Sequence, residues 1–135
     1  MKHRIFYAYI VALFSFSQLL HAQCDIPQPF TANTGSNMTI LLTGSFLQSI
    51  SINNDDAYIV AILDDGMVVG TVYFNDPNGG VGLSQGQGTI AIWGDDTDSP
   101  EKDGASTGDN ISFQLVDGVK NMNISTRYNN IYNLN

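Results

Sequence analysis

The sequence predicts an all-β chain, a single antiparallel β-sandwich of seven or eight strands that follows a cleaved signal peptide. Short apolar runs recur at regular spacing, separated by turns rich in glycine, asparagine and aspartate. After the N-terminal region, no run has its apolar residues at the i, i+3, i+4, i+7 spacing of an amphipathic helix. Asp65-Gly66 and Asp117-Gly118 each separate two apolar runs, and this dipeptide favours a tight hairpin in which both central residues have positive φ.

The expected strands follow one another within residues 37–135, the predicted sandwich domain. Their ranges are 38–43, 46–52, 57–63, 67–74, 89–93, 110–117 and 119–125, with a further edge strand in the tail 127–135. The run 57–63 is apolar at nearly every position, which is typical of a central strand packed on both faces. The run 46–52 has its phenylalanine and two isoleucines on positions of the same parity, which indicates a strand with one buried face.

Residues 1–22 have the features of a secretory signal peptide. Lys2 and Arg4 give a positively charged start, an apolar run follows, and Ala22 precedes the expected cleavage point. The apolar run is short for a membrane-spanning helix, which needs about 20 residues. We therefore expect a protein that is secreted or displayed at the cell surface, without membrane insertion after cleavage.

After cleavage, residues 23–36 form an extended segment that leads into the domain, because Pro27 and Pro29 disfavour a helix there. Cys24 is the only cysteine, so no internal disulfide can form. Gln23 stands where a lipoprotein signal would have a small residue, which disfavours a lipid anchor on Cys24.

Removing the signal peptide changes the charge and the chemistry of the chain. His3 and His21 leave with it, and Lys102, Lys120 and Arg127 remain as the basic residues against thirteen acidic ones. A chain this acidic repels phosphate backbones, so we expect no nucleic-acid partner. Without histidine, the serine–histidine–aspartate triad and the common zinc sites cannot form. We predict that the protein is not an enzyme, with a hydrolase that uses two carboxylates as the alternative.

The stretch 95–109 contains the densest group of acidic residues in the chain. Calcium binds about six to eight oxygen atoms, many of them from carboxylates, so a loop of this composition is a candidate calcium site. The candidate ligands are Asp95, Asp96, Asp98 and Asp103. The alternative is a solvated loop in which aspartate side chains cap turns through their own backbone.

Trp93 ends the run 89–93, just before the acidic stretch. Ile90 and Ile92 form a natural core face, which puts Trp93 on the opposite side of the strand. An aromatic ring there can stack on a sugar or pack on a protein, so Trp93 is the candidate contact for a glycan or a cell-surface protein. The alternative is that Trp93 packs in the core or against a second layer, as strand tryptophans in sandwiches commonly do.

Three stretches resemble a module found in secreted Bacteroidota proteins. They are NTGSNMTILLTG (33–44), YIVAILDDGMVVGTVYF (58–74) and IAIWGDDTDSPEKDGASTGDNISFQLVD (90–117), and the tryptophan–glycine–aspartate–aspartate loop is the most specific part. The resemblance implies an Ig-like sandwich with an adhesive or glycan-binding role and no established catalytic residues. Such modules often stand beside a C-terminal type IX sorting domain, whereas a short asparagine-rich tail follows here.

These features together predict a secreted, non-catalytic β-sandwich module for binding or adhesion, with calcium as a candidate stabiliser. Two alternatives stay open. One is a purely structural module of a larger or truncated surface protein, and the other is a polysaccharide hydrolase that works with carboxylates.

Overall fold

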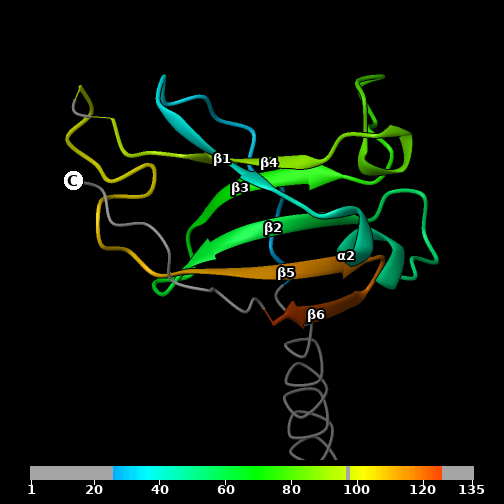
Figure 1. The fold of residues 1–135 in the computed structure, drawn as a ribbon. Helices are drawn as coiled ribbons and strands as arrows, with labels where there is room; N and C mark the ends of the chain where they lie inside the picture. Colours follow the sequence, from blue (N-terminus) through cyan, green and yellow to red (C-terminus); the bar gives the residue numbers. More distant parts are fainter. Residues whose placement is uncertain (1–25, 97, 126–135) are drawn as a thin grey trace, which may run out of the picture.

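The computed structural model describes residues 26–96 and 98–125 and confirms the all-β prediction. The strands are β1 (Asn37–Leu41), β2 (Tyr58–Leu63), β3 (Val68–Tyr73), β4 (Thr89–Trp93), β5 (Ile111–Asp117) and β6 (Lys120–Ile124). The helices are α2 (Gly44–Ser49) and the 3-10 turn η2 (Leu83–Gln85). β1 and β4 form sheet A, and the other strands form sheet B in the order β3-β2-β5-β6, all antiparallel (Figure 1).

The described residues contain six strands, fewer than the seven or eight expected, because the run 46–52 is not a strand. Its first part belongs to α2, whose N-cap is Thr43, and the Thr43 hydroxyl accepts a hydrogen bond of 3.3 Å from Phe46 N. Phe46 and Ile50 both pack against the core. An i, i+4 pair shares one side of a helix as well as one parity of a strand, so the apolar pattern alone did not separate the two.

The predicted signal peptide, residues 1–22, and the predicted edge strand at 127–135 lie outside the described residues. Within the described part of the chain, no helix has the length and apolar character needed to cross a membrane. Residues 26–36 form neither helix nor strand.

Both Asp-Gly dipeptides lie in hairpin turns. In the β2–β3 turn, Leu63 N donates to Met67 O at 2.9 Å and Gly66 has a φ of 89°. Gly118, in the β5–β6 turn, has a φ of 63°. Among the described residues only glycines have positive φ, so the expectation that the aspartate would share it is wrong. Asp65 instead caps its turn, because its Oδ1 accepts a hydrogen bond of 2.9 Å from Met67 N.

The main core lies between the two sheets. Its buried members are Ala57, Ile59, Ala61, Leu63, Val69, Val72, Phe74, Leu83, Ile90, Ile92, Phe113 and Leu115. β4 approaches β3 closely because Gly70 has no side chain, and a Cβ there would lie 2.3 Å from the carbonyl oxygen of Ala91. Gly70 therefore sets how near sheet A can pack on sheet B.

The opposite face of sheet B carries a smaller apolar cluster, formed by Val60, Ile62 and Val116. Side chains of this sheet hold the segment that leads into the domain. The Tyr58 hydroxyl donates to Pro27 O at 2.8 Å, and Phe30 N donates to Thr71 Oγ1 at 2.8 Å. These two bonds fix the path of the segment and bring Phe30 to the edge of the sandwich.

Asp117, at the end of β5, anchors the chain that connects α2 to β2. The residue is 2% exposed, and its carboxylate accepts hydrogen bonds of 2.6 to 3.2 Å from the backbone and side-chain nitrogens of Asn53 and Asn54. The side-chain bonds from Asn53 and Asn54 are the main cause that holds the pKa of Asp117 below its usual value, against the effect of burial. In this Asp-Gly pair, the aspartate therefore also holds the connection between α2 and β2 in place.

Candidate functional site

The acidic loop, residues 94–105, is closed at its base beside the end of β4. Ala105 N donates to Trp93 O at 2.9 Å. Gly104 is buried against Gly94, and a Cβ on Gly104 would lie 2.3 Å from the carbonyl carbon of Gly94. Gly104 is therefore needed because the two backbone segments touch there, whereas a Cβ on Gly94 would make only ordinary contacts of 3.6 Å or more.

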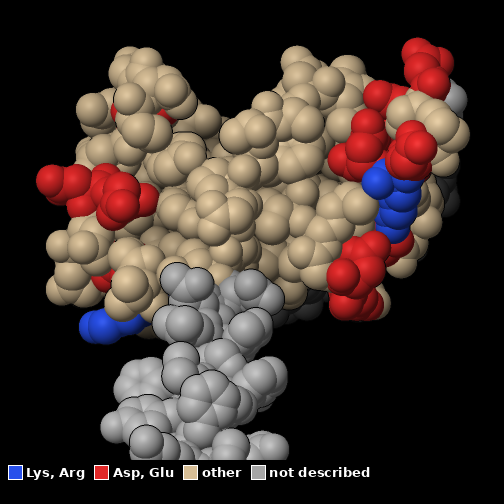
Figure 2. Space-filling model, turned by 180° about the vertical axis from the view of Figure 1, so that it is seen from behind, with Lys and Arg blue, Asp and Glu red and all other residues tan. Residues whose placement is uncertain are grey.

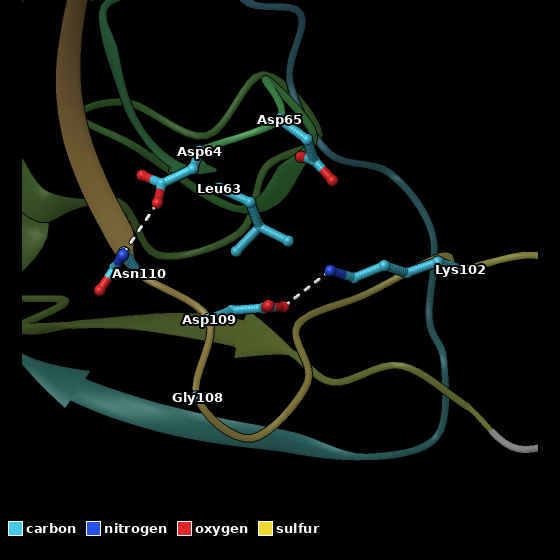
Figure 3. A pocket seen from close by; sticks show the side chains of 7 residues that line it. All are labelled: Leu63, Asp64, Asp65, Lys102, Gly108, Asp109 and Asn110. Carbon is cyan, nitrogen blue, oxygen red and sulfur yellow. Dashed lines mark hydrogen bonds and ion pairs between the residues drawn. The ribbon is translucent and has the colours of Figure 1, made fainter.

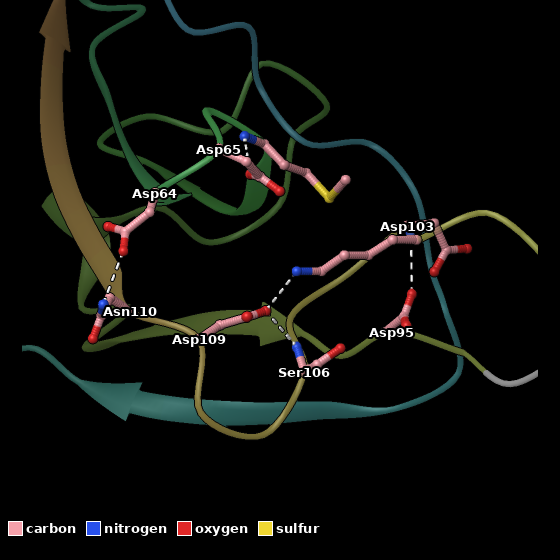
Figure 4. Close-up of polar contacts among 9 residues, drawn as sticks. Asp64, Asp65, Asp95, Asp103, Ser106, Asp109 and Asn110 are labelled. Atoms are coloured by element: carbon pink, nitrogen blue, oxygen red, sulfur yellow. Dashed lines mark hydrogen bonds and ion pairs between the residues drawn. The ribbon is translucent and has the colours of Figure 1, made fainter.

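Three of the predicted calcium ligands cap backbone N–H groups of this loop. Asp95 Oδ1 accepts a hydrogen bond of 2.9 Å from Asp103 N (Figure 4), and Asp103 Oδ1 accepts one of 3.3 Å from Asp96 N. Asp96 Oδ1 accepts from Asp98 N at 3.0 Å and from Ser99 N at 2.8 Å. This is the turn-capping arrangement that the sequence left as the alternative to a metal site.

Calcium binding by the acidic loop stays a prediction. The fourth predicted ligand, Asp98, is exposed, and its carboxylate accepts no hydrogen bond among the described residues. Within 26–96 and 98–125, no three or more aspartate, glutamate, histidine or cysteine side chains are grouped as a metal site requires. A cation at this loop would have to share the oxygens of Asp95, Asp96 and Asp103 with backbone donors.

Trp93 lies on the outer side of sheet A. Ile90 and Ile92 are each 1% exposed and face the core from the alternate positions of β4, as expected. The half-buried indole stacks on Phe30, with 6.4 Å between the ring centroids and 26° between the ring planes. Directly across the sheet, Trp93 is paired with exposed Asn37.

The outer face of sheet A carries no charged residue. Its members are Asn37, Thr39, Leu41, Thr89, Ala91 and Trp93. Leu41 is 72% exposed and is paired with Thr89, at the end of the sheet opposite to Trp93. The face therefore combines an aromatic ring with smaller apolar groups, hydroxyls and an amide.

A small pocket lies between the acidic loop, the β2–β3 turn and the start of β5 (Figure 3). Its volume is about 220 Å³, and its lining residues are Leu63, Asp64, Asp65, Lys102, Gly108, Asp109 and Asn110. Lys102 Nζ forms an ion pair of 2.8 Å with Asp109 Oδ2, and Asn110 Nδ2 donates to Asp64 Oδ2 at 2.8 Å. Asp109 Oδ2 also accepts a hydrogen bond of 2.8 Å from Ser106 N (Figure 4). These contacts tie the loops to one another.

The Lys102–Asp109 pair also affects titration. Its hydrogen bond is the largest cause that raises the pKa of Lys102, and the same bond, helped by the one from Ser106 N, lowers the pKa of Asp109. A glycosidase needs the opposite, a carboxyl group with a raised pKa that serves as the general acid. Asp109 is therefore unsuited to that role.

The acidic side chains gather at two ends of the molecule. Figure 2 shows both groups from behind, with a broad surface free of charged side chains between them. The acidic loop and the pocket lie at one of these ends. The outer face of sheet A reaches this end through Trp93, which is followed by Gly94, Asp95 and Asp96.

The chain matches no known protein family, no curated protein and no solved structure. Two residues beside Trp93, Phe30 and Asn37, could not be recognised from the sequence. Both lie far from Trp93 along the chain, and only the path of the leading segment and the register of β1 on β4 bring them to the indole.

Proposed function

We propose that this protein is a secreted, non-catalytic β-sandwich module that binds a glycan or a cell-surface protein through the outer face of sheet A. The observation that carries the proposal is the position of Trp93, half-buried on the side of β4 that faces away from the core. Stacking on Phe30 holds the indole in place while part of it stays accessible. Tryptophans of this kind commonly anchor ligands at protein surfaces.

The hydrogen bonds and the ion pair of the carboxylates in and beside the acidic loop support binding rather than catalysis. Asp95, Asp96 and Asp103 are engaged with backbone N–H groups, and Asp109 is paired with Lys102. Carboxylates that serve as caps and ion-pair partners are not free to exchange protons with a substrate. A hydrolase is therefore the weakest of the alternatives.

The Ig-like character of the sandwich, its export and its resemblance to the Bacteroidota module belong to the same proposal. Two antiparallel sheets around a shared core support the Ig-like assignment. The backbone caps favour an acidic loop that keeps its shape without calcium. Calcium bound by Asp95, Asp96, Asp98 and Asp103 is the alternative for this loop.

A purely structural module is the second candidate function. The closed base of the acidic loop favours it, because the contact between Gly94 and Gly104 and the caps on Asp103 N and Asp96 N account for the shape of the loop without a ligand. In that case the loop only joins β4 to β5.

Retention of the secreted chain on immobilised polysaccharides and on a cell-surface protein extract, with calcium present, separates the two candidates. We expect the wild type to be retained and Trp93→Ala to be washed off. Met122→Ala, at a residue 42% exposed on β6, should be retained like the wild type. A wild-type chain that binds neither material would contradict the binding function and leave the structural one.

A further inference from the structure

Building on the proposed function, we infer that the ligand of the outer face of sheet A is a neutral polysaccharide that lies along β1 and β4. Three properties of this face indicate the chemical class of the ligand: its mixture of groups, its lack of charge, and its length.

The mixture of groups suits sugar rings. A pyranose presents C–H groups on its faces and hydroxyls at its edges, so it can stack on an aromatic ring while its edges form hydrogen bonds. Trp93 and Leu41 supply apolar surface at the two ends of the face; Asn37 lies directly across from Trp93, and Thr39 lies on β1 between Asn37 and Leu41. Within the described residues the side chains of Asn37 and Thr39 form no hydrogen bond, so an amide and a hydroxyl remain for a ligand.

The charges argue for a neutral ligand. The outer face of sheet A carries none, and the nearest charges along the chain are the carboxylates of Asp95 and Asp96, just after Trp93. They would repel uronic acids and sulfated sugars at this end of the face. They also offer little to a basic peptide, because both already accept hydrogen bonds from the backbone of the acidic loop.

The length argues for a chain rather than a single sugar. A strand rises by about 3.3 Å per residue, so the path from Asn37 to Leu41 covers about 13 Å. The paired strands β1 and β4 run along this path (Figure 1), and Leu41 is 72% exposed at its far end. An extended polymer can contact Trp93 and Leu41 at once, which a monosaccharide cannot do.

The test uses the full secreted chain and binding assays on two sets of polymers. Insoluble β-glucan, mannan and chitin are the neutral set; polygalacturonate and chondroitin sulfate are the acidic set; a cell-surface protein extract is the third material. The variants are Trp93→Ala and the matched pair Leu41→Glu and Val119→Glu. Leu41 and Val119 are 72% and 83% exposed, so neither glutamate should disturb folding, and only Leu41 lies on the outer face of sheet A.

We expect retention on at least one neutral polymer. Affinity should change by less than about twofold between 0.1 and 1 M salt, because no charge pair is involved. Trp93→Ala and Leu41→Glu should each weaken binding by at least about tenfold, and Val119→Glu should bind like the wild type. Leu41→Glu keeps the test valid if Trp93→Ala does not fold.

Two results would overturn the inference in different ways. Binding to acidic polymers or to proteins that still depends on Trp93 and Leu41 would leave the proposed function intact and refute the neutral polysaccharide. Binding that neither Trp93→Ala nor Leu41→Glu weakens, or no binding to any of the three materials, would refute both.

Discussion

Asp95 Oδ1 accepts a hydrogen bond of 2.9 Å from the backbone nitrogen of Asp103, near the opposite end of the acidic loop. A second hydrogen bond joins the same two parts of the loop, with the carboxylate on the other side: Asp103 Oδ1 accepts it from Asp96 N at 3.3 Å. Hydrogen bonds from their own side chains thus hold the two ends of the loop together, next to the contact between Gly94 and Gly104. The acidic residues at this place have a structural task whether or not they bind a ligand.

Removal of the Asp95 cap should destabilise the fold. Asp95→Ala leaves Asp103 N without its acceptor, and we expect the free energy of unfolding to fall by about 1 kcal/mol. Urea denaturation measures the change. Asp98→Ala is the control, since Asp98 is exposed and its carboxylate caps nothing among the described residues. Equal losses in the two variants would contradict the cap.

Melting curves with calcium and with a chelator test the metal site. An ion that binds only the folded state at a hundredfold excess over its Kd would raise the free energy of unfolding by about 2.7 kcal/mol. Because the loop carboxylates already cap backbone groups, we expect the same Tm in both conditions. A higher Tm in calcium that disappears in Asp95→Ala would instead establish the calcium site predicted from the sequence.

Gly70→Ala should destabilise the protein by about 1–3 kcal/mol, the usual effect of overpacking a core. The added Cβ would lie 2.3 Å from the carbonyl oxygen of Ala91 and would push sheet A away from β3. Gly44→Ala, where no atom lies within 4 Å of the new methyl group, is the matched control. Thermal unfolding that shifts no further for Gly70→Ala than for Gly44→Ala would show that the two strands are not in close contact.

Asp117 should make the protein sensitive to acid. Its pKa is lower in the folded than in the unfolded chain, so the stability it contributes is present above the unfolded value of about 3.9 and is lost as the pH falls through the folded pKa. We expect Tm to fall steeply below about pH 4 in the wild type and less steeply in Asp117→Asn, which also melts lower at neutral pH. The slope should decrease without vanishing, because the pKa of Asp109 is lowered as well. Parallel pH profiles for the two proteins would refute the role of Asp117.

The sequence predicted much of the fold because local patterns determine it. The run 89–93 coincides with β4, and the alternation around Ile90 and Ile92 correctly placed the isoleucines in the core. The prediction for the run 46–52 failed because Thr43 caps a helix there, and a helix of six residues is too short for its period to show. Its apolar side chains still face the core that the sequence predicted for them.

The site was harder to foresee, since its geometry depends on contacts between distant segments. Trp93 could be singled out from composition and strand parity, but its stacking on Phe30 depends on Thr71 holding the leading segment. The buried role of Asp117 was equally hidden, because its donors, Asn53 and Asn54, are reached only when β5 packs beside β2. The density of acidic residues in the sequence indicated the acidic loop, but it did not predict which N–H groups donate to the carboxylate oxygens.

The most direct test uses the fluorescence of Trp93, the only tryptophan in the chain. The protein is titrated with a soluble neutral oligosaccharide taken from the polymer that retains it, while emission and quenching by acrylamide are recorded. Binding on the outer face of sheet A predicts a blue shift and protection from the quencher, because the sugar covers the exposed part of the indole. Emission and quenching that stay unchanged at saturation, with binding shown independently by calorimetry, would contradict the role of this face.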